Sequence, residues 1–178
     1  LELGIDPIEL RVRNEPEIDP ETGRPFSTRN LIACVREGAA RFGFDAARHG
    51  VAASTYPARR RPSRALARAL DDGTFHVEIG AADIGTGTWT SLSQIAADAL
   101  GVDTDALELR IGDTDLPPAS VAGGSSGLTS WGSAIVAAAN QFRHDHGKVP
   151  AVGVTTTAEG PEEPGDQKFT VQSFGAQF

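Results

Sequence analysis

The sequence predicts an α+β fold built from strand-loop-helix-strand units, and three segments lead to that prediction. Residues 75–81, FHVEIGA, alternate apolar with polar side chains, as is typical of a half-buried strand. Residues 89–100, WTSLSQIAADAL, place apolar residues at helical spacing and precede Gly101, a common residue after a helix. Residues 107–113, LELRIGD, alternate again. The order strand, loop, helix, strand is therefore expected over residues 75–113.

The N-terminal region is expected to be helical. The sequence DPIE at 6–9 combines an N-cap aspartate, a first-turn proline and an acidic third residue, which predicts a short helix over 7–13. A second helix, with apolar residues at helical spacing, is expected to be capped by Ser27 or Thr28 and to extend to Phe42.

The sequence predicts that the chain divides into four segments. Residues 51–56 and the end of the chain are expected to be strands, and residues 131–140 a helix. The expected segments are an N-terminal helical region at 1–50, an α/β unit at 51–143, a surface excursion or linker at 144–167, and a strand cut off at its end at 168–178. Because the 178 residues include no methionine, we expect the chain to be an excerpt of a longer polypeptide.

Composition limits the classes of partner. The chain has 16 basic and 24 acidic residues, and a net charge of −8 disfavours broad binding to nucleic acid or to an anionic membrane. The basic run RRRPSR at 59–64 is expected to be a solvated loop. The single cysteine, Cys34, excludes an intrachain disulfide framework and a cysteine-rich zinc site. No apolar run approaches the roughly 20 residues that span a bilayer.

Two loops rich in small residues each precede an expected helix. In the first, Gly85 to Thr88, glycine leaves backbone N–H groups bare for an anion at a helix start, and the threonines add uncharged hydroxyl groups. The second runs from Gly124 to Gly127. Either loop alone is also what a capped turn would look like. Two such loops within one α/β unit predict a cradle for an elongated polar ligand.

Familiar motifs fit these loops poorly. The first loop lacks the lysine of a phosphate-binding P-loop, and Thr90 stands where a dinucleotide fingerprint needs its third glycine. Residues 123–127, GGSSG, match the nucleophile elbow of serine hydrolases with Ser125 as nucleophile, but prolines precede them where a central strand is needed. The HDH at 144–146 offers two metal ligands without an evident third, so a surface turn is expected there and no metal site.

Three stretches carry a family resemblance: LGIDPIELRVRNEPEIDPETGRPFS, VEIGAADIGTGTWTSLSQIAADALGV and PPASVAGGSSGLTSWGSAIVAAA. Together they resemble the molybdenum-cofactor-binding large subunit of the xanthine dehydrogenase and aldehyde oxidase family, closest to the bacterial aldehyde dehydrogenase branch. The resemblance implies that the α+β units form part of the second molybdopterin-binding domain. Many members have Gly-Gln-Gly in the first loop, where this chain has threonine at position 86.

The resemblance also implies a site, a cofactor and partners. The implied ligand is molybdopterin cytosine dinucleotide with molybdenum, and iron–sulfur clusters and FAD are expected on partner subunits of a cytoplasmic or periplasmic bacterial complex. The implied substrate is an aldehyde, a purine or another heteroaromatic compound. No catalytic residue is expected in this chain, because the family's general-base glutamate lies in a segment that the sequence does not reach. The implied cofactor-binding residues are Ile84, Gly85, Thr86, Gly87, Thr88, Gly124, Ser125, Ser126 and Gly127. The alternative is a non-catalytic scaffold or interface module.

Overall fold

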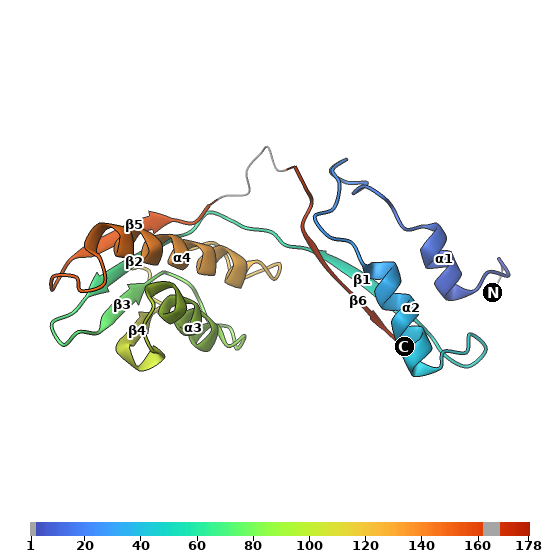
Figure 1. Ribbon diagram of the computed structural model, residues 1–178, viewed down its shortest axis with the longest axis horizontal. Coiled ribbons are helices and arrows are strands. Elements are labelled where there is room, and N and C mark those ends of the chain that lie inside the picture. The colour runs from blue at the N-terminus through green and yellow to red at the C-terminus, as the bar shows by residue number, and fades with distance from the viewer. Residues whose placement is uncertain (1–2, 162–167) are drawn as a thin grey trace. The chain divides into compact units, whose positions relative to one another are not determined.

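The computed structural model describes residues 3–161 and 168–178, which divide into two compact units (Figure 1). The first unit combines the N-terminal residues up to Ala58 with the C-terminal segment, and the second unit begins at Arg59. This division differs from the expected α/β unit at 51–143. The strand expected at 51–56 belongs to the first unit because it pairs with the C-terminal strand.

The first unit contains two helices and a two-stranded antiparallel sheet. Its elements are α1 (Pro7–Arg13), α2 (Leu31–Phe42), β1 (Ala52–Pro57) and β6 (Gln172–Gln177). The short first helix is confirmed, and the Asp6 carboxylate caps it by accepting from the amides of Ile8 and Glu9. The strand expected within 168–178 is confirmed as β6.

The cap of the second helix lies two or three residues later than the expected Ser27 or Thr28. Its N-cap is Asn30, which makes no side-chain capping bond. Ser27 donates its amide to the carbonyl of Thr170, and Phe26 forms a parallel bridge with that residue, so the chain here is extended. Arg29 is then held by Glu15 at 2.6 Å, which fixes the segment before the helix. Pairing with the C-terminal segment therefore outweighs the local capping signal.

The second unit is a four-stranded sheet with two helices on one face (Figure 1). The strand order is β4-β3-β2-β5, and only β3 and β4 are parallel. Helix α3 connects them, so the expected strand-loop-helix-strand unit and the α+β class are confirmed. The elements are β2 (Arg64–Ala69), β3 (Phe75–Glu78), α3 (Thr88–Leu100), the short 3-10 helix η1 (Thr104–Ala106), β4 (Leu107–Arg110), α4 (Gly127–His146) and β5 (Thr155–Glu159).

Two strands of this sheet were not expected. Strand β2 is central, and the sequence predicted no element over 65–69. The loop expected at 59–64 is found up to Ser63, and Arg64 already belongs to the strand. Strand β5 lies inside the expected linker at 144–167. Ala65, Ala67 and Ala69 alternate with longer side chains along β2 and are buried. Alanine is depleted in strands, which hides this alternation from a reading based on β propensity. Helix α4 also continues past the expected 131–140 to His146.

The core lies between the sheet and the two helices. Val77 and Ile79 from the β3 region meet Leu92 of α3 and Ile135 and Phe142 of α4, all almost fully buried. The small side chains of β2 leave room for α4, which packs against that strand. This packing fixes the start of both helices, where the two loops of interest lie.

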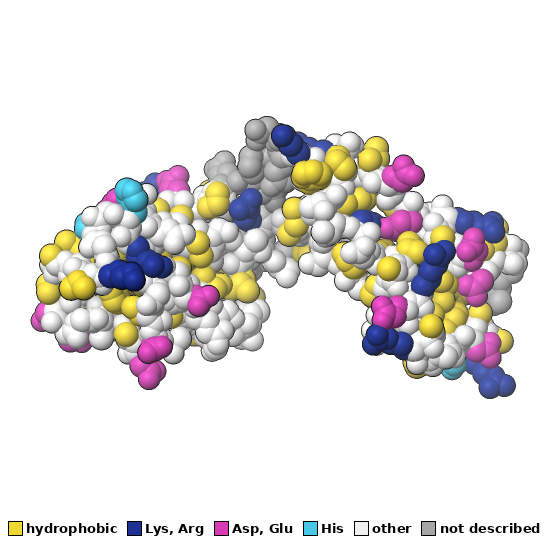
Figure 2. Space-filling view, in the orientation of Figure 1, with side chains coloured by type: hydrophobic (Ala, Val, Ile, Leu, Met, Phe, Trp, Pro, Cys, Tyr) yellow, Lys and Arg dark blue, Asp and Glu magenta, His cyan; other side chains and the backbone are white. Residues whose placement is uncertain are grey.

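Charge does not mark out a site on the face shown in Figure 2, where acidic and basic side chains are interspersed with uncharged ones over both units. Within 3–161 and 168–178, the structure has no helix with the length and hydropathy needed to cross a membrane.

Candidate functional site

The two predicted loops face one cavity of about 400 Å³ in the second unit. Six of the nine predicted residues line it: Ile84, Thr86, Thr88, Gly124, Ser125 and Gly127. Sequence reasoning missed the rest of the lining, which includes Ser91, Leu128 and Trp131. Ser91 lies in the first turns of α3, and Leu128 and Trp131 lie in the first two turns of α4. The helices bring these side chains to the cavity, and nothing in the loop sequences indicates it.

Asp83 organises the first loop. Its Oδ1 accepts from the amides of Gly85 at 2.8 Å and Thr86 at 3.0 Å, and its Oδ2 accepts from the amide of Trp89 at 3.4 Å. The loop therefore already holds an anion, supplied by the chain itself, at the start of α3. Sequence reasoning missed this role, although an aspartate two residues before a glycine is a common turn signal.

The Asp83 carboxyl is ionised at neutral pH. Desolvation raises its pKa, but the backbone amides that donate to the carboxylate lower the pKa by more, so the net shift is downward. A phosphate placed on the same amides would meet this negative charge and would have to displace it. The first loop is therefore poorly suited to bind a phosphate through its backbone.

What the first loop offers the cavity is hydroxyl groups. The hydroxyls of Thr86 and Thr88 lie 3.0 Å apart and share a hydrogen bond, and Thr88 is buried. Gly85 and Gly87 do not line the cavity, and a Cβ at either position would meet nothing within 4 Å. Their φ angles of +89° and +72° show that these glycines serve the turn of the backbone.

The second loop is held by neutral hydrogen bonds. The indole Nε1 of Trp131 donates to the carbonyl of Ser120 at 3.0 Å, and the amide of Ser120 donates to the hydroxyl of Ser63 at 3.1 Å. Ser126 is 1% exposed, and its hydroxyl donates to the carbonyl of Gly123 at 2.9 Å. Ser126 therefore holds the loop together and does not reach the cavity.

The start of α4 differs from the start of α3 because no described side chain caps its first turn. Gly124 and Ser125 lead into this turn with φ angles of +62° and +52°. Gly127 is required by packing, since a Cβ there would lie 2.8 Å from the Trp131 ring. Uncapped first-turn amides and the positive end of the helix dipole together favour an anionic group.

The serine hydrolase alternative finds no support in this geometry. His144 and His146 lie at the far end of α4, and at 1.5 Å of rise per residue the helix places them about 26 Å or more from its start near Ser125. His144 pairs with Asp145 at 2.9 Å. Within the part of the chain that the structure describes, no group of three metal-ligating side chains comes together.

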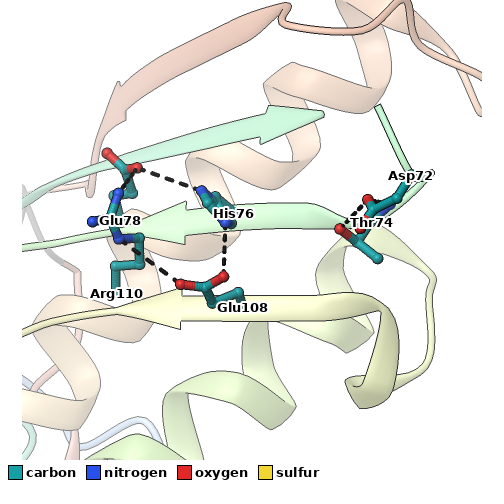
Figure 3. Close-up of polar contacts among 6 residues, drawn as sticks. All are labelled: Asp72, Thr74, His76, Glu78, Glu108 and Arg110. Carbon is teal, nitrogen blue, oxygen red and sulfur yellow. Dashed lines mark hydrogen bonds and ion pairs between the residues drawn. The ribbon is translucent and has the colours of Figure 1, made fainter. Parts of the chain in front are cut away.

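A separate polar cluster lies on the sheet face opposite the helices (Figure 3). Nε2 of His76 lies 2.9 Å from a Glu108 oxygen, and Arg110 lies 3.3 Å from a Glu78 oxygen. The parallel register of β3 and β4 produces both pairs. The alternation of residues 75–81 had placed His76 away from the core, as is found. Each group in the cluster has a partner of its own, which is typical of an ion-pair network.

The comparisons with known proteins agree with the sequence resemblance. The family model described as "Molybdopterin cofactor-binding domain" matches residues 32–175. The aldehyde oxidoreductase molybdenum-binding subunit PaoC of Escherichia coli K12 is 36% identical over 155 residues, which cover 79% of this chain and 21% of that protein. A putative xanthine dehydrogenase molybdenum-binding subunit, XdhA, of the same organism is 34% identical over 138 residues, which cover 65% of this chain and 18% of that protein.

Solved structures support the same fold. An aldehyde oxidoreductase from Desulfovibrio desulfuricans has a TM-score of 0.78 at 22% identity, covering 98% of this chain and 24% of that one. A reconstituted CO dehydrogenase from Oligotropha carboxidovorans has a TM-score of 0.75 at 18% identity, and the match covers 98% of this chain and 32% of that one. The chain spans about a fifth of the length of the curated relatives it matches. It belongs to the molybdopterin cofactor-binding family that includes the molybdenum-binding subunits of aldehyde oxidoreductases and xanthine dehydrogenases.

Proposed function

We propose that this chain forms one wall of the cofactor site in a molybdenum oxidoreductase, and that the cavity between its two loops holds part of the cofactor. The observation that carries the proposal is that both loops, about 40 residues apart in sequence, line the same cavity. Family membership supports the class of ligand, and the shared cavity supports this location for it.

The cavity lining fits a molybdopterin group. The side chains that line it are small, hydroxylic or apolar, and none carries a charge. Such a lining suits a polar heterocycle held by many modest hydrogen bonds. The hydroxyls of Thr86 and Thr88 would bind uncharged parts of the pterin. The shorter threonine at position 86 cannot reach as far toward the metal as the glutamine that many relatives carry in this loop.

The phosphate groups would bind at the second loop. The backbone of Gly124, Ser125 and Gly127 reaches the cavity next to the uncapped first turn of α4. At the first loop, by contrast, Asp83 already occupies the backbone donors. We therefore assign Ser125, Gly127 and Leu128 to the anionic end of the cofactor, in its cytosine dinucleotide form. Gly85, Gly87 and Ser126 shape the loops without touching the cofactor.

The complete enzyme would oxidise aldehydes or hydroxylate heteroaromatic compounds such as purines. When bound, molybdenum supplies the two-electron and oxygen-transfer chemistry. This chain would contribute binding and orientation only, and the general base would come from elsewhere in the enzyme. Iron–sulfur and FAD subunits would accept the electrons, and the complex would work in the bacterial cytoplasm or periplasm.

The test is a change of charge at the second loop. Leu128 is half exposed and lines the cavity, so Leu128→Glu places a carboxylate beside the proposed phosphate, whereas Leu128→Gln is nearly isosteric and neutral. An acidic residue in the first turn favours the helix, so Leu128→Glu should fold normally. Like-charge repulsion at close range should reduce cofactor content at least about tenfold in the glutamate variant and little in the glutamine variant.

Molybdenum and released cytidine monophosphate would be measured per purified subunit of the complete enzyme. A second variant, Ser125→Gly, relieves a positive φ and removes a hydroxyl group, so it should fold at least as well and still bind less cofactor. If all three variants keep full cofactor, the chain is a scaffold module. Molybdenum without cytidine nucleotide would contradict the dinucleotide form alone.

A further inference from the structure

A second cavity, of about 480 Å³, lies at the opposite end of the helix pair in the second unit. Its walls come from the C-terminal ends of α3 and α4, the hairpin between β2 and β3, and the segment after α4. It shares no residue with the loop cavity. The proposed function makes no use of it.

The charge of this second cavity is unusual for a chain with net charge −8. Arg143 and Lys148 line it, and the described lining contains no acidic side chain. Arg143 is anchored, because its Nη1 donates to the carbonyl of Ala99 at 3.1 Å. This contact leaves other guanidinium donors available. Neither cation forms an ion pair with any described carboxylate.

The helix ends oppose this charge only in part. A helix C-terminus carries roughly half a negative charge, so α3 and α4 together bring about one. Arg143 neutralises part of it by binding a carbonyl at the end of α3. Counting the charges of Arg143 and Lys148 once each against the two helix ends leaves a net charge of about +1. The cavity therefore attracts an anion.

The other walls are apolar and partly aromatic. Phe75 and Phe142 lie edge to face at a centroid distance of 6.0 Å, and Leu100 and Val102 extend the same wall. Val149, at the rim beside Lys148, is 92% exposed. The volume falls within the roughly 300–1,000 Å³ that small-molecule sites occupy. An apolar wall with a few convergent polar groups is the usual arrangement of such sites.

We propose that this cavity binds a small organic anion with a flat apolar body, of the aromatic carboxylate class. The carboxylate would lie between Arg143 and Lys148, and its ring would pack on the wall formed by Phe75, Leu100 and Val102. Arginine suits this task because its planar guanidinium matches a carboxylate in geometry. The inference does not depend on the molybdopterin assignment, since the two cavities are separate.

The test uses 2-naphthoate as probe and neutral 2-naphthamide as its matched control, with the 178-residue chain labelled with ¹⁵N. Titration with 2-naphthoate should shift the amide signals of Gly101 and Gly147, which line the cavity, and leave those of Thr86 and Gly124 unchanged. The amide should bind at least about threefold more weakly, because it lacks the charge.

Three variants locate the contact. Arg143→Gln should lower the affinity for 2-naphthoate about tenfold or more, because charge-assisted hydrogen bonds are lost. Lys148→Gln should lower this affinity about threefold. Lys148 is exposed, so the substitution should not disturb folding. Lys168→Gln makes the same charge change in the first unit and should have no effect. Equal binding of the two probes, equal effects at both lysines, or shifts confined to the loop cavity would each overturn the proposal.

Discussion

The two loops of the candidate site look alike in sequence and differ in charge. Both are built from glycine and hydroxyl residues, and both begin a helix that covers the same sheet. The first holds the Asp83 carboxylate on its own amides, whereas no described side chain caps the second. The negative group that a helix start attracts is therefore part of the chain in one loop. In the other loop, we propose that a ligand supplies it.

Small-residue composition alone therefore does not locate an anion site. Whether such a loop can bind an external anion depends on whether a side chain already accepts hydrogen bonds from its backbone amides. Packing differs as well: the second loop is tied to Trp131, which is 3% exposed, while Trp89 beside the first loop is 48% exposed. The second loop should therefore be the more rigid and the more sensitive to substitution.

The two tryptophans provide the largest expected contrast. Trp131→Ala should lower the free energy of unfolding by about 3–5 kcal/mol, because it removes a buried ring and leaves the Ser120 carbonyl without its donor. Trp89→Ala should change it by less than about 1 kcal/mol, as for most exposed positions. Urea denaturation followed by circular dichroism would measure both. Equal losses would mean that the first loop is packed as firmly as the second.

Glycine substitutions should lower the free energy of unfolding by an intermediate amount. They also separate two causes of instability, overpacking and backbone strain. Gly127→Ala brings a Cβ within 2.8 Å of the Trp131 ring, and overpacking of this kind costs about 1–3 kcal/mol. Gly87→Ala meets no neighbour but strains a φ of +72°, at a cost of about 1–2 kcal/mol.

The separating measurement is Trp131 fluorescence in a Trp89→Phe background. The emission should shift in Gly127→Ala and stay unchanged in Gly87→Ala. If both variants shift the emission equally, packing against Trp131 does not distinguish the loops.

The smallest expected effect concerns pH and the first loop alone. The folded pKa of Asp83 lies below its ordinary value, so its stabilising contribution is present above an unfolded pKa of about 3.9 and is lost as pH falls through the folded pKa. Asp83→Asn should therefore be less stable than the parent chain at pH 6, and the gap should narrow at pH 3. Urea midpoints at both pH values would measure it. A gap that stays constant with pH would show that the charge plays no part.

Much of the second unit could be predicted from local pattern. The segment from β3 through α3 to β4 has clear periodicity and a glycine helix end, and it was expected correctly. Strand β2 was missed because its buried positions are alanines, and β5 because threonines and a nearby proline and glycine are also typical of linkers. The late start of α2 depends on pairing with Thr170, which lies far away in sequence.

The lining of the cavity could be predicted only in outline. Both loops were identified, because glycine and hydroxyl clusters before a helix are visible in the sequence. The roles within them were not. Ser126 is a buried loop support, Gly127 is set by the ring of Trp131, and the donors of the first loop are taken by Asp83. Each of these depends on an atom that only the folded chain brings near.

The pairing of β1 with β6 has a consequence for the order of folding. Pro57 pairs with Gln172, so the first unit cannot complete its sheet until the ends of an intervening segment of more than 100 residues meet. Closing so long a loop in an unfolded chain is entropically unfavourable, and folding of the second unit shortens the effective loop. The second unit should therefore fold first, and its folding should bring β1 and β6 of the first unit together. Pulse-labelled hydrogen exchange would then find Ala67 protected before Ala53.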